Sequence, residues 1–144
     1  QKIYNLTDTV CADGTEADLN KIEEMTRNEL CDVVIDATGS DRSMNRSLEF
    51  CAFGGRVVYV GITQGKLSFP HAPLLHRREL SILGSRNALS RDFDRIVKDI
   101  EAGRINTAPW ITHRMSWTEL PEIFPQLVDP SSGVLKAVAT IESV

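Results

Sequence analysis

The sequence predicts a parallel α/β fold. Short apolar runs rich in β-branched residues alternate with helical patterns from Thr9 to Leu83, and only short turns separate them. The length of 144 residues corresponds to about one domain, which can bury a core without disulfide staples. Right-handed strand–helix–strand units of this kind place successive strands side by side in one sheet.

The first expected elements are a strand, a helix and a second strand. Thr9–Ala12 is apolar and ends at the turn pair Asp13-Gly14. Apolar residues recur every three positions over Glu16–Arg27, which predicts an amphipathic helix. Asp32–Asp36 has a continuous apolar centre, typical of a strand buried on both faces of a parallel sheet. We expect Thr9–Ala12 to lie beside Asp32–Asp36, because the helix between them can form a right-handed crossover.

A second helix and two more strands follow. Apolar side chains at i, i+4 and i+7 (Met44, Leu48 and Cys51) predict a helix that Asp41 or Ser43 caps and Gly54-Gly55 ends. Arg56–Val60 is the strongest strand pattern in the chain. An irregular stretch then leads to a short strand at Glu79–Leu83.

The last part of the chain predicts a helix, a strand, a second helix and a final strand. Ser90–Ala102 has the best-specified helical pattern, with Ser90 as its expected cap and Gly103 after its end. Ile111–Arg114 is a predicted strand, and Ser116–Glu119 has the spacing of a capping box before a helix. Lys136–Ile141 is the closing strand.

Composition excludes several classes of function. The 20 acidic residues outnumber the 16 basic ones, for a net charge of −4, which argues against binding to nucleic acid or to an anionic membrane surface. No apolar run reaches the ~18–20 residues of a membrane helix. The three cysteines form no C-x-x-C pair, and we interpret them as reduced, mostly buried thiols of a cytoplasmic protein. The three histidines have no metal-ligand spacing, so no metal site is predicted within the chain.

Glycines that follow three predicted strands are the main candidates for a ligand site: Gly39, Gly61 and Gly84. Ligands of open α/β sheets bind at the carboxyl ends of the strands, where glycine lets them approach the backbone. A tight turn alone would also explain each glycine, and both interpretations stay open. The phosphate-binding pattern G-x-G-x-x-G is absent.

Charged residues near these strands admit two interpretations. The arginines at 77, 78, 86, 91 and 95 alternate with acidic residues, which favours a solvated, ion-paired face. Arg86 differs because it follows a strand end among small polar residues, where a guanidinium could bind an anionic ligand. Asp32 and Asp36 flank a strand, and we expect them to cap or to pair rather than to catalyse.

Five segments in this order resemble the medium-chain zinc-type alcohol and polyol dehydrogenases. The segments are Asp32–Gly39 (DVVIDATG), Phe53–Gly61 (FGGRVVYVG), Leu80–Arg86 (LSILGSR), Ile111–Arg114 (ITHR) and Asp129–Lys136 (DPSSGVLK). The best match is with the branch of sorbitol, threonine and sugar-acid dehydrogenases. The resemblance implies that residues 1–86 are the second half of a Rossmann dinucleotide-binding domain. Residues 87–144 would be a C-terminal segment that returns to a GroES-like catalytic domain, and the first Rossmann strands and the zinc ligands would precede Gln1.

The resemblance also implies roles for individual residues. Cofactor contacts are expected from eight positions: Thr38, Gly39, Val60, Gly61, Ile62, Ser81, Leu83 and Lys136. Val60–Ile62 would meet the nicotinamide carboxamide, and Lys136 would reach the pyrophosphate. Arg86 and Asn87 would orient a polyol or sugar-acid substrate.

Two functions of different class follow from these observations. One is the C-terminal part of a dehydrogenase that uses zinc and NAD or NADP, whose isolated chain would be inactive. The alternative is a self-standing α/β binding module without catalysis. The choice between NAD and NADP and the identity of the alcohol cannot be predicted from these residues. Proteins of the resembled family commonly pair the sheet's edge strand across subunits, so we expect a homodimer or larger assembly through Glu79–Leu83.

Overall fold

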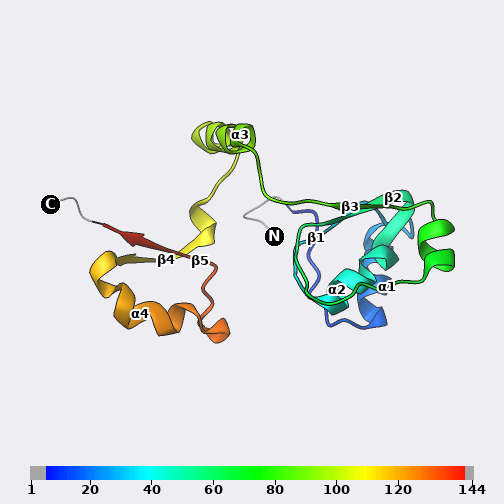
Figure 1. Ribbon diagram of the computed structural model, residues 1–144, viewed down its shortest axis with the longest axis horizontal. Helices are drawn as coiled ribbons and strands as arrows, with labels where there is room; N and C mark the ends of the chain where they lie inside the picture. The colour runs from blue at the N-terminus through cyan, green and yellow to red at the C-terminus, as the bar shows by residue number, and fades with distance from the viewer. Residues whose placement is uncertain (1–5, 142–144) are drawn as a thin grey trace. The chain divides into compact units, whose positions relative to one another are not determined.

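The computed structural model describes residues 6–141 and divides them into two compact units (Figure 1). The first unit extends through Asn87 and the second begins at Ala88. No helix within the described range combines the length and apolar character that a membrane span requires.

The first unit is a parallel three-stranded sheet with helices between its strands. Its elements are α1 (Glu16–Met25), β1 (Cys31–Asp36), α2 (Asp41–Arg46), the 3₁₀-helix η1 (Ser47–Phe50), β2 (Cys51–Tyr59), the π-helix η2 (His71–His76) and β3 (Ser81–Gly84). The strand order is β1-β2-β3, and both pairings are parallel. The predicted parallel α/β class is therefore confirmed.

The core of this unit lies on one face of the sheet. Leu48, Cys51 and Val57 are fully buried, and Met44 is 3% exposed. Partly buried apolar residues from β1, β2 and the segment around η2 pack against this cluster: Val34, Tyr59, Phe69, Leu74, Leu75 and Leu80. On the opposite face Ile35 remains 64% exposed, so the unit buries the sheet from one side.

The predicted strand at Thr9–Ala12 is wrong. Among the described residues of the first unit this segment does not join the sheet. An apolar cavity of about 360 Å³ separates Val10 and Ala12 from Val33 and Val34 of β1. The two backbones therefore cannot form a ladder, and β1 is an edge strand.

The second predicted helix is shorter than its sequence pattern. The α-helix ends at Arg46, a 3₁₀ turn follows, and Cys51 already belongs to β2, where it pairs with Cys31 of β1. The N-cap is neither Asp41 nor Ser43 but Ser40, whose hydroxyl accepts the Ser43 N–H. Met44 of α2, Leu48 of η1 and Cys51 of β2 are nevertheless all buried. The apolar side chains thus stay on the core side although the backbone changes from α-helix to 3₁₀-helix to strand.

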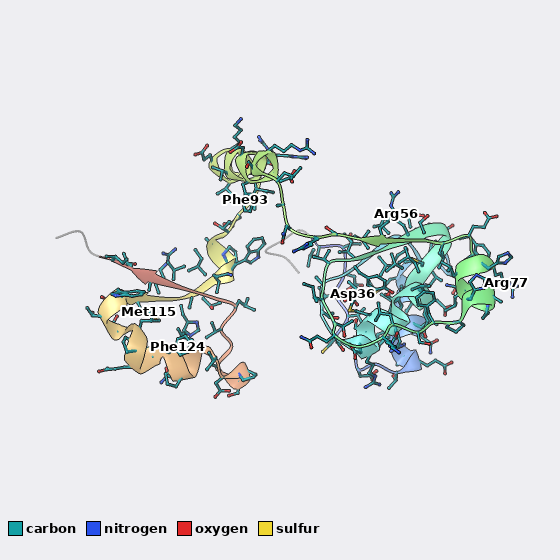
Figure 2. The ribbon with its side chains drawn as sticks, in the orientation of Figure 1. Asp36, Arg56, Arg77, Phe93, Met115 and Phe124 are labelled. Atoms are coloured by element: carbon teal, nitrogen blue, oxygen red, sulfur yellow. The ribbon has the colours of Figure 1, made fainter. Side chains whose placement is uncertain are left out.

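Arg78 closes the corner between η1 and β2. Its guanidinium donates to the carbonyl oxygens of Glu49 and Cys51, at 3.0 and 2.9 Å. Its own carbonyl accepts the Gly54 N–H at 2.7 Å. The expectation of a solvated, ion-paired face is therefore wrong for Arg78, whereas Arg77 is exposed (Figure 2).

The last strand of the sheet starts two residues later than predicted. Leu80 N–H donates to the Leu75 carbonyl at 3.0 Å, and Glu79 has a positive φ of 54°. Residues 79 and 80 thus complete the turn that ends η2, and β3 begins at Ser81.

The second unit contains two helices and a parallel pair of strands. Its elements are α3 (Ser90–Glu101), η3 (Ala108–Trp110), β4 (Ile111–Ser116), η4 (Trp117–Glu119), α4 (Leu120–Leu127), η5 (Pro130–Ser132) and β5 (Lys136–Thr140). The predicted capping box is confirmed, because the Glu119 carboxylate accepts the Ser116 N–H at 2.7 Å and the Ser116 hydroxyl caps the turn. Met115 of β4 is buried, while Phe124 of α4 is 54% exposed (Figure 2).

The start of α3 differs from the prediction. Its N-cap is Leu89, whose N–H donates to the Asp92 carboxylate at 2.8 Å, so Ser90 is the first helical residue. Gly103 follows the end of the helix as predicted, with a φ of 70°.

Candidate functional site

The carboxyl ends of the three parallel strands lie along one edge of the first unit's sheet. Asp36 of β1 pairs with Tyr59 of β2, which pairs with Gly84 of β3. The segments directly after these residues carry most of the predicted site: Thr38 and Gly39, then Val60, Gly61 and Ile62, then Arg86 and Asn87. The topology therefore places seven of the ten predicted residues along one edge, where open α/β sheets bind their ligands.

Asp36 organises this edge. Its side chain is buried and accepts hydrogen bonds from the Thr38 N–H at 2.9 Å, the Thr38 hydroxyl at 2.8 Å and the Ser43 hydroxyl at 2.7 Å. Burial acts to raise the pKa of this carboxyl, but the bonds from Ser43 and Thr38 outweigh it and hold the pKa below its usual value. Asp36 pairs with its neighbours, as the sequence predicts.

The backbone of Asp36 joins β1 to the next turn. Its carbonyl oxygen accepts the N–H groups of Val60 and Gly61, at 2.8 and 3.0 Å. These two amides are therefore engaged within the protein, and a ligand at this turn would meet other groups of Val60–Ile62.

Gly39 and Gly61 bring the first two turns into backbone contact. A Cβ on Gly61 would lie 2.5 Å from the Gly39 nitrogen and 3.1 Å from its Cα. Gly39 has a φ of 66°, and a Cβ there would lie 3.2 Å from the Ile62 carbonyl oxygen. Turn packing thus explains both glycines without a ligand. By contrast, a Cβ on Gly84 would meet no atom within 4 Å.

A cavity of about 300 Å³ adjoins the first turn, and polar as well as apolar side chains line it. Thr38, Ser40 and Arg42 line one part of it and Ala12–Gly14 another. The Arg42 guanidinium donates to the Gly14 carbonyl at 2.7 Å. Asp13 and Asp18 also line the cavity, and hydroxyls beside carboxylates suit ribose hydroxyls rather than phosphate oxygens. Sequence reasoning missed Ser40 and Arg42, because nothing in the sequence pairs Arg42 with a glycine 28 positions earlier.

The remaining predicted residues lie elsewhere. Ser81 is at the amino end of β3, opposite Arg56 and three residues before Gly84, so it is about 10 Å from the edge that carries the turns. Leu83 pairs with Val58 and is 47% exposed. Lys136 is the first residue of β5 in the second unit.

Groups for metal binding or covalent catalysis are not assembled in residues 6–141. No cluster of three or more His, Cys, Asp or Glu side chains in that range could hold a metal ion. Burial raises the pKa of the Cys51 thiol and, together with the charge of Asp32, that of Cys31. Neither thiol is activated as a nucleophile, since the reactive thiolate is disfavoured. Cys11 is exposed, so the expectation of mostly buried thiols holds for Cys51 alone.

Comparison with known proteins assigns residues 6–102 to a family described as zinc-binding dehydrogenases. L-galactonate-5-dehydrogenase of Escherichia coli (strain K12) is 35% identical to this chain over 111 residues, which are 77% of the chain and 32% of the relative.

Two solved structures are also similar to this chain. Alcohol dehydrogenase TADH from Thermus sp. ATN1 has a TM-score of 0.73 at 24% identity, over 86% of this chain and 35% of that one. A zinc-binding dehydrogenase from Sinorhizobium meliloti 1021 bound to NADP has a TM-score of 0.64 at 26% identity, over 76% and 31%. The first likeness shows the fold alone. The chain spans about a third of the length of these proteins.

Proposed function

The chain belongs to the zinc-binding dehydrogenase family, and on that premise we propose that it is the cofactor-binding part of an enzyme that oxidises a polyol or sugar acid. The similarity to L-galactonate-5-dehydrogenase supports a sugar-acid or polyol substrate. The relative bound to NADP supports a nicotinamide cofactor. The observation that carries the proposal is the shared edge of β1, β2 and β3, where the turns at Thr38–Gly39 and Val60–Ile62 meet.

We assign the two ends of the cofactor to different turns along this edge. Thr38 and Gly39, beside the 300 Å³ cavity, would hold the adenosine ribose. Val60, Gly61 and Ile62, with Leu83 near the end of β3, would hold the nicotinamide end. The family resemblance, rather than a position at this edge, is the basis for assigning Ser81 to the carboxamide and Lys136 of the second unit to the pyrophosphate. When bound, the nicotinamide supplies the hydride acceptor, while Arg86 and Asn87 orient the alcohol.

Zinc finds no ligand set among the described residues of this chain. Because the chain spans about a third of its relatives, we propose that the rest of the protein provides the zinc ligands. The residues described above then bind and orient the cofactor, and they take no part in metal coordination.

The experiment uses the full-length gene product that contains this chain. NADH and NADPH binding is measured by fluorescence, and oxidation of sugar acids and polyols by the absorbance of the reduced cofactor. We expect one cofactor to bind at micromolar concentration and at least one sugar acid or polyol to be oxidised. Failure to bind either cofactor would refute the proposal. The isolated 144-residue chain should not bind cofactor tightly, and a low-micromolar Kd for it would contradict the need for the rest of the protein.

A homodimer through β3 is part of the same proposal. In the first unit β3 is an edge strand, paired only with β2, and its residues Ile82 and Leu83 are 37% and 47% exposed. A second copy related by a two-fold axis could pair with this strand and satisfy its backbone groups. Light scattering of the full-length protein should give at least a dimer, which Ile82→Pro should dissociate. A monomer at high micromolar concentration would contradict this part.

The proposed location is the cytoplasm. Cys11, Cys31 and Cys51 are all free thiols, and free thiols persist in a reducing compartment. Fractionation of the native cells, with an antibody against the full-length protein, tests this assignment.

A further inference from the structure

Two side chains of α2 hold the loop that follows β2. Asp41 and Asn45 lie one helical turn apart and therefore on the same face of the helix. The Thr63 hydroxyl donates to the Asp41 carboxylate, and the Ser68 N–H donates to Asn45 Oδ1 at 2.6 Å. These bonds fix the loop at two points as it runs from β2 toward η2 (Figure 1).

The loop is built to fit this helix face. The Thr63 hydroxyl gives its proton to Asp41 and accepts the Gly65 N–H at 3.0 Å, so one hydroxyl links the carboxylate to the loop backbone. A Cβ on Gly65 would overlap the Asp41 carboxylate. A larger residue at position 65 would therefore displace the Asp41 side chain from its present position.

The same loop begins at the turn that we assign to the nicotinamide. Gly61 is fixed against Gly39, and Ile62 follows with its side chain 84% exposed. Two residues after Gly61 the chain reaches Thr63 and the first bond to α2. The conformation of the turn is therefore determined from one side by Gly39 and from the other by Asp41 and Asn45.

We propose that Asp41 and Asn45 are positioning residues that hold residues 61–68 in the conformation that binds the cofactor. The identity of the ligand in this role rests on the proposed function. The hydrogen bonds from α2 to the loop do not depend on it. Without both bonds, part of the molecules would have the loop in another conformation. The apparent cofactor affinity then falls in proportion to the fraction of molecules that still have the binding conformation. With ordinary net strengths for two hydrogen bonds, we expect about a 5- to 10-fold weaker affinity.

The test uses the full-length protein with Asp41→Ala, Asn45→Ala and the double variant. Asp41→Asn serves as the conservative variant, because its amide oxygen can still accept the Thr63 proton. Asp94→Ala on α3 is the control for loss of an exposed carboxylate. Thermal melting identifies variants that fail to fold. Hydrogen exchange of a peptide covering residues 61–68 is measured without cofactor, and NADH binding is measured by fluorescence.

We expect faster exchange at Gly65 and Ser68 and weaker NADH binding in the double variant, partial recovery with Asp41→Asn, and no change with Asp94→Ala. Unchanged exchange would overturn the loop contacts. Faster exchange with unchanged NADH affinity would overturn the positioning role. If the unmodified protein binds no NADH or NADPH, the proposed function fails and this role fails with it, even where exchange shows that α2 holds the loop.

Discussion

Substitution of Gly61 by alanine tests the contact between the first two turns. The new Cβ would lie 2.5 Å from the Gly39 nitrogen, 3.1 Å from its Cα and 3.2 Å from the Ala37 carbonyl carbon. All three are backbone atoms, so no side chain can rotate away. The φ of Gly61 is outside the left-handed region, and the cost is therefore steric. Overpacking of this kind costs about 1–3 kcal/mol.

Gly84→Ala is the matched control, because Gly84 also ends a strand of the same sheet and a Cβ there would meet nothing within 4 Å. Alanine restricts the unfolded chain, so this variant should be unchanged or more stable by up to about 1 kcal/mol. Urea unfolding of the full-length protein, followed by circular dichroism, compares the two. Equal midpoints for Gly61→Ala and Gly84→Ala would show that the two turns do not touch.

Three further substitutions in the full-length protein probe single residues. Asp36→Asn should cost about 2 kcal/mol at pH 7 through weakened hydrogen bonds. Because the folded-state pKa of Asp36 is lowered, its carboxylate stabilises the fold above the unfolded pKa. The difference from wild type should therefore shrink below about pH 4, and urea unfolding at pH 7 and pH 3.5 checks this. Lys136→Ala should weaken NADH binding by about 1 kcal/mol or more at low salt, as titration would show. Arg86→Ala should lower kcat/KM for an acidic or polyhydroxy substrate and leave the cofactor Kd unchanged; equal losses would place Arg86 on the cofactor.

Local patterns in the sequence predicted the helices and strands themselves better than they predicted which strands pair with each other. The apolar periodicity of α1, α3 and β2 and the capping box at Ser116–Glu119 depend on neighbours in the chain, and they appear in the structure. The assignment of Thr9–Ala12 to a strand failed, because a strand requires a second backbone at hydrogen-bonding distance. A cavity lies there instead.

The site shows the same division. Glycines and hydroxyls that follow strands can be located from the sequence, and parallel pairing then brings them to one edge. Contacts between distant segments could not be predicted, such as the bond from Arg42 to Gly14 or from Thr63 to Asp41. They depend on how far each loop folds back, which composition and periodicity do not encode.

The hydrogen bonds of Arg78 affect the order in which this chain folds during synthesis. The carbonyl oxygens of Glu49 and Cys51 receive the Arg78 guanidinium, which lies 29 and 27 positions later in the chain. When β1, α2 and most of β2 have emerged from the ribosome, Arg78 has therefore not yet emerged, and the corner between η1 and β2 lacks its hydrogen-bond donor. Contacts of such separation slow folding and leave apolar strands exposed meanwhile. Nascent chains that end before Arg78 should be captured by chaperones, and those that extend beyond β3 should be released.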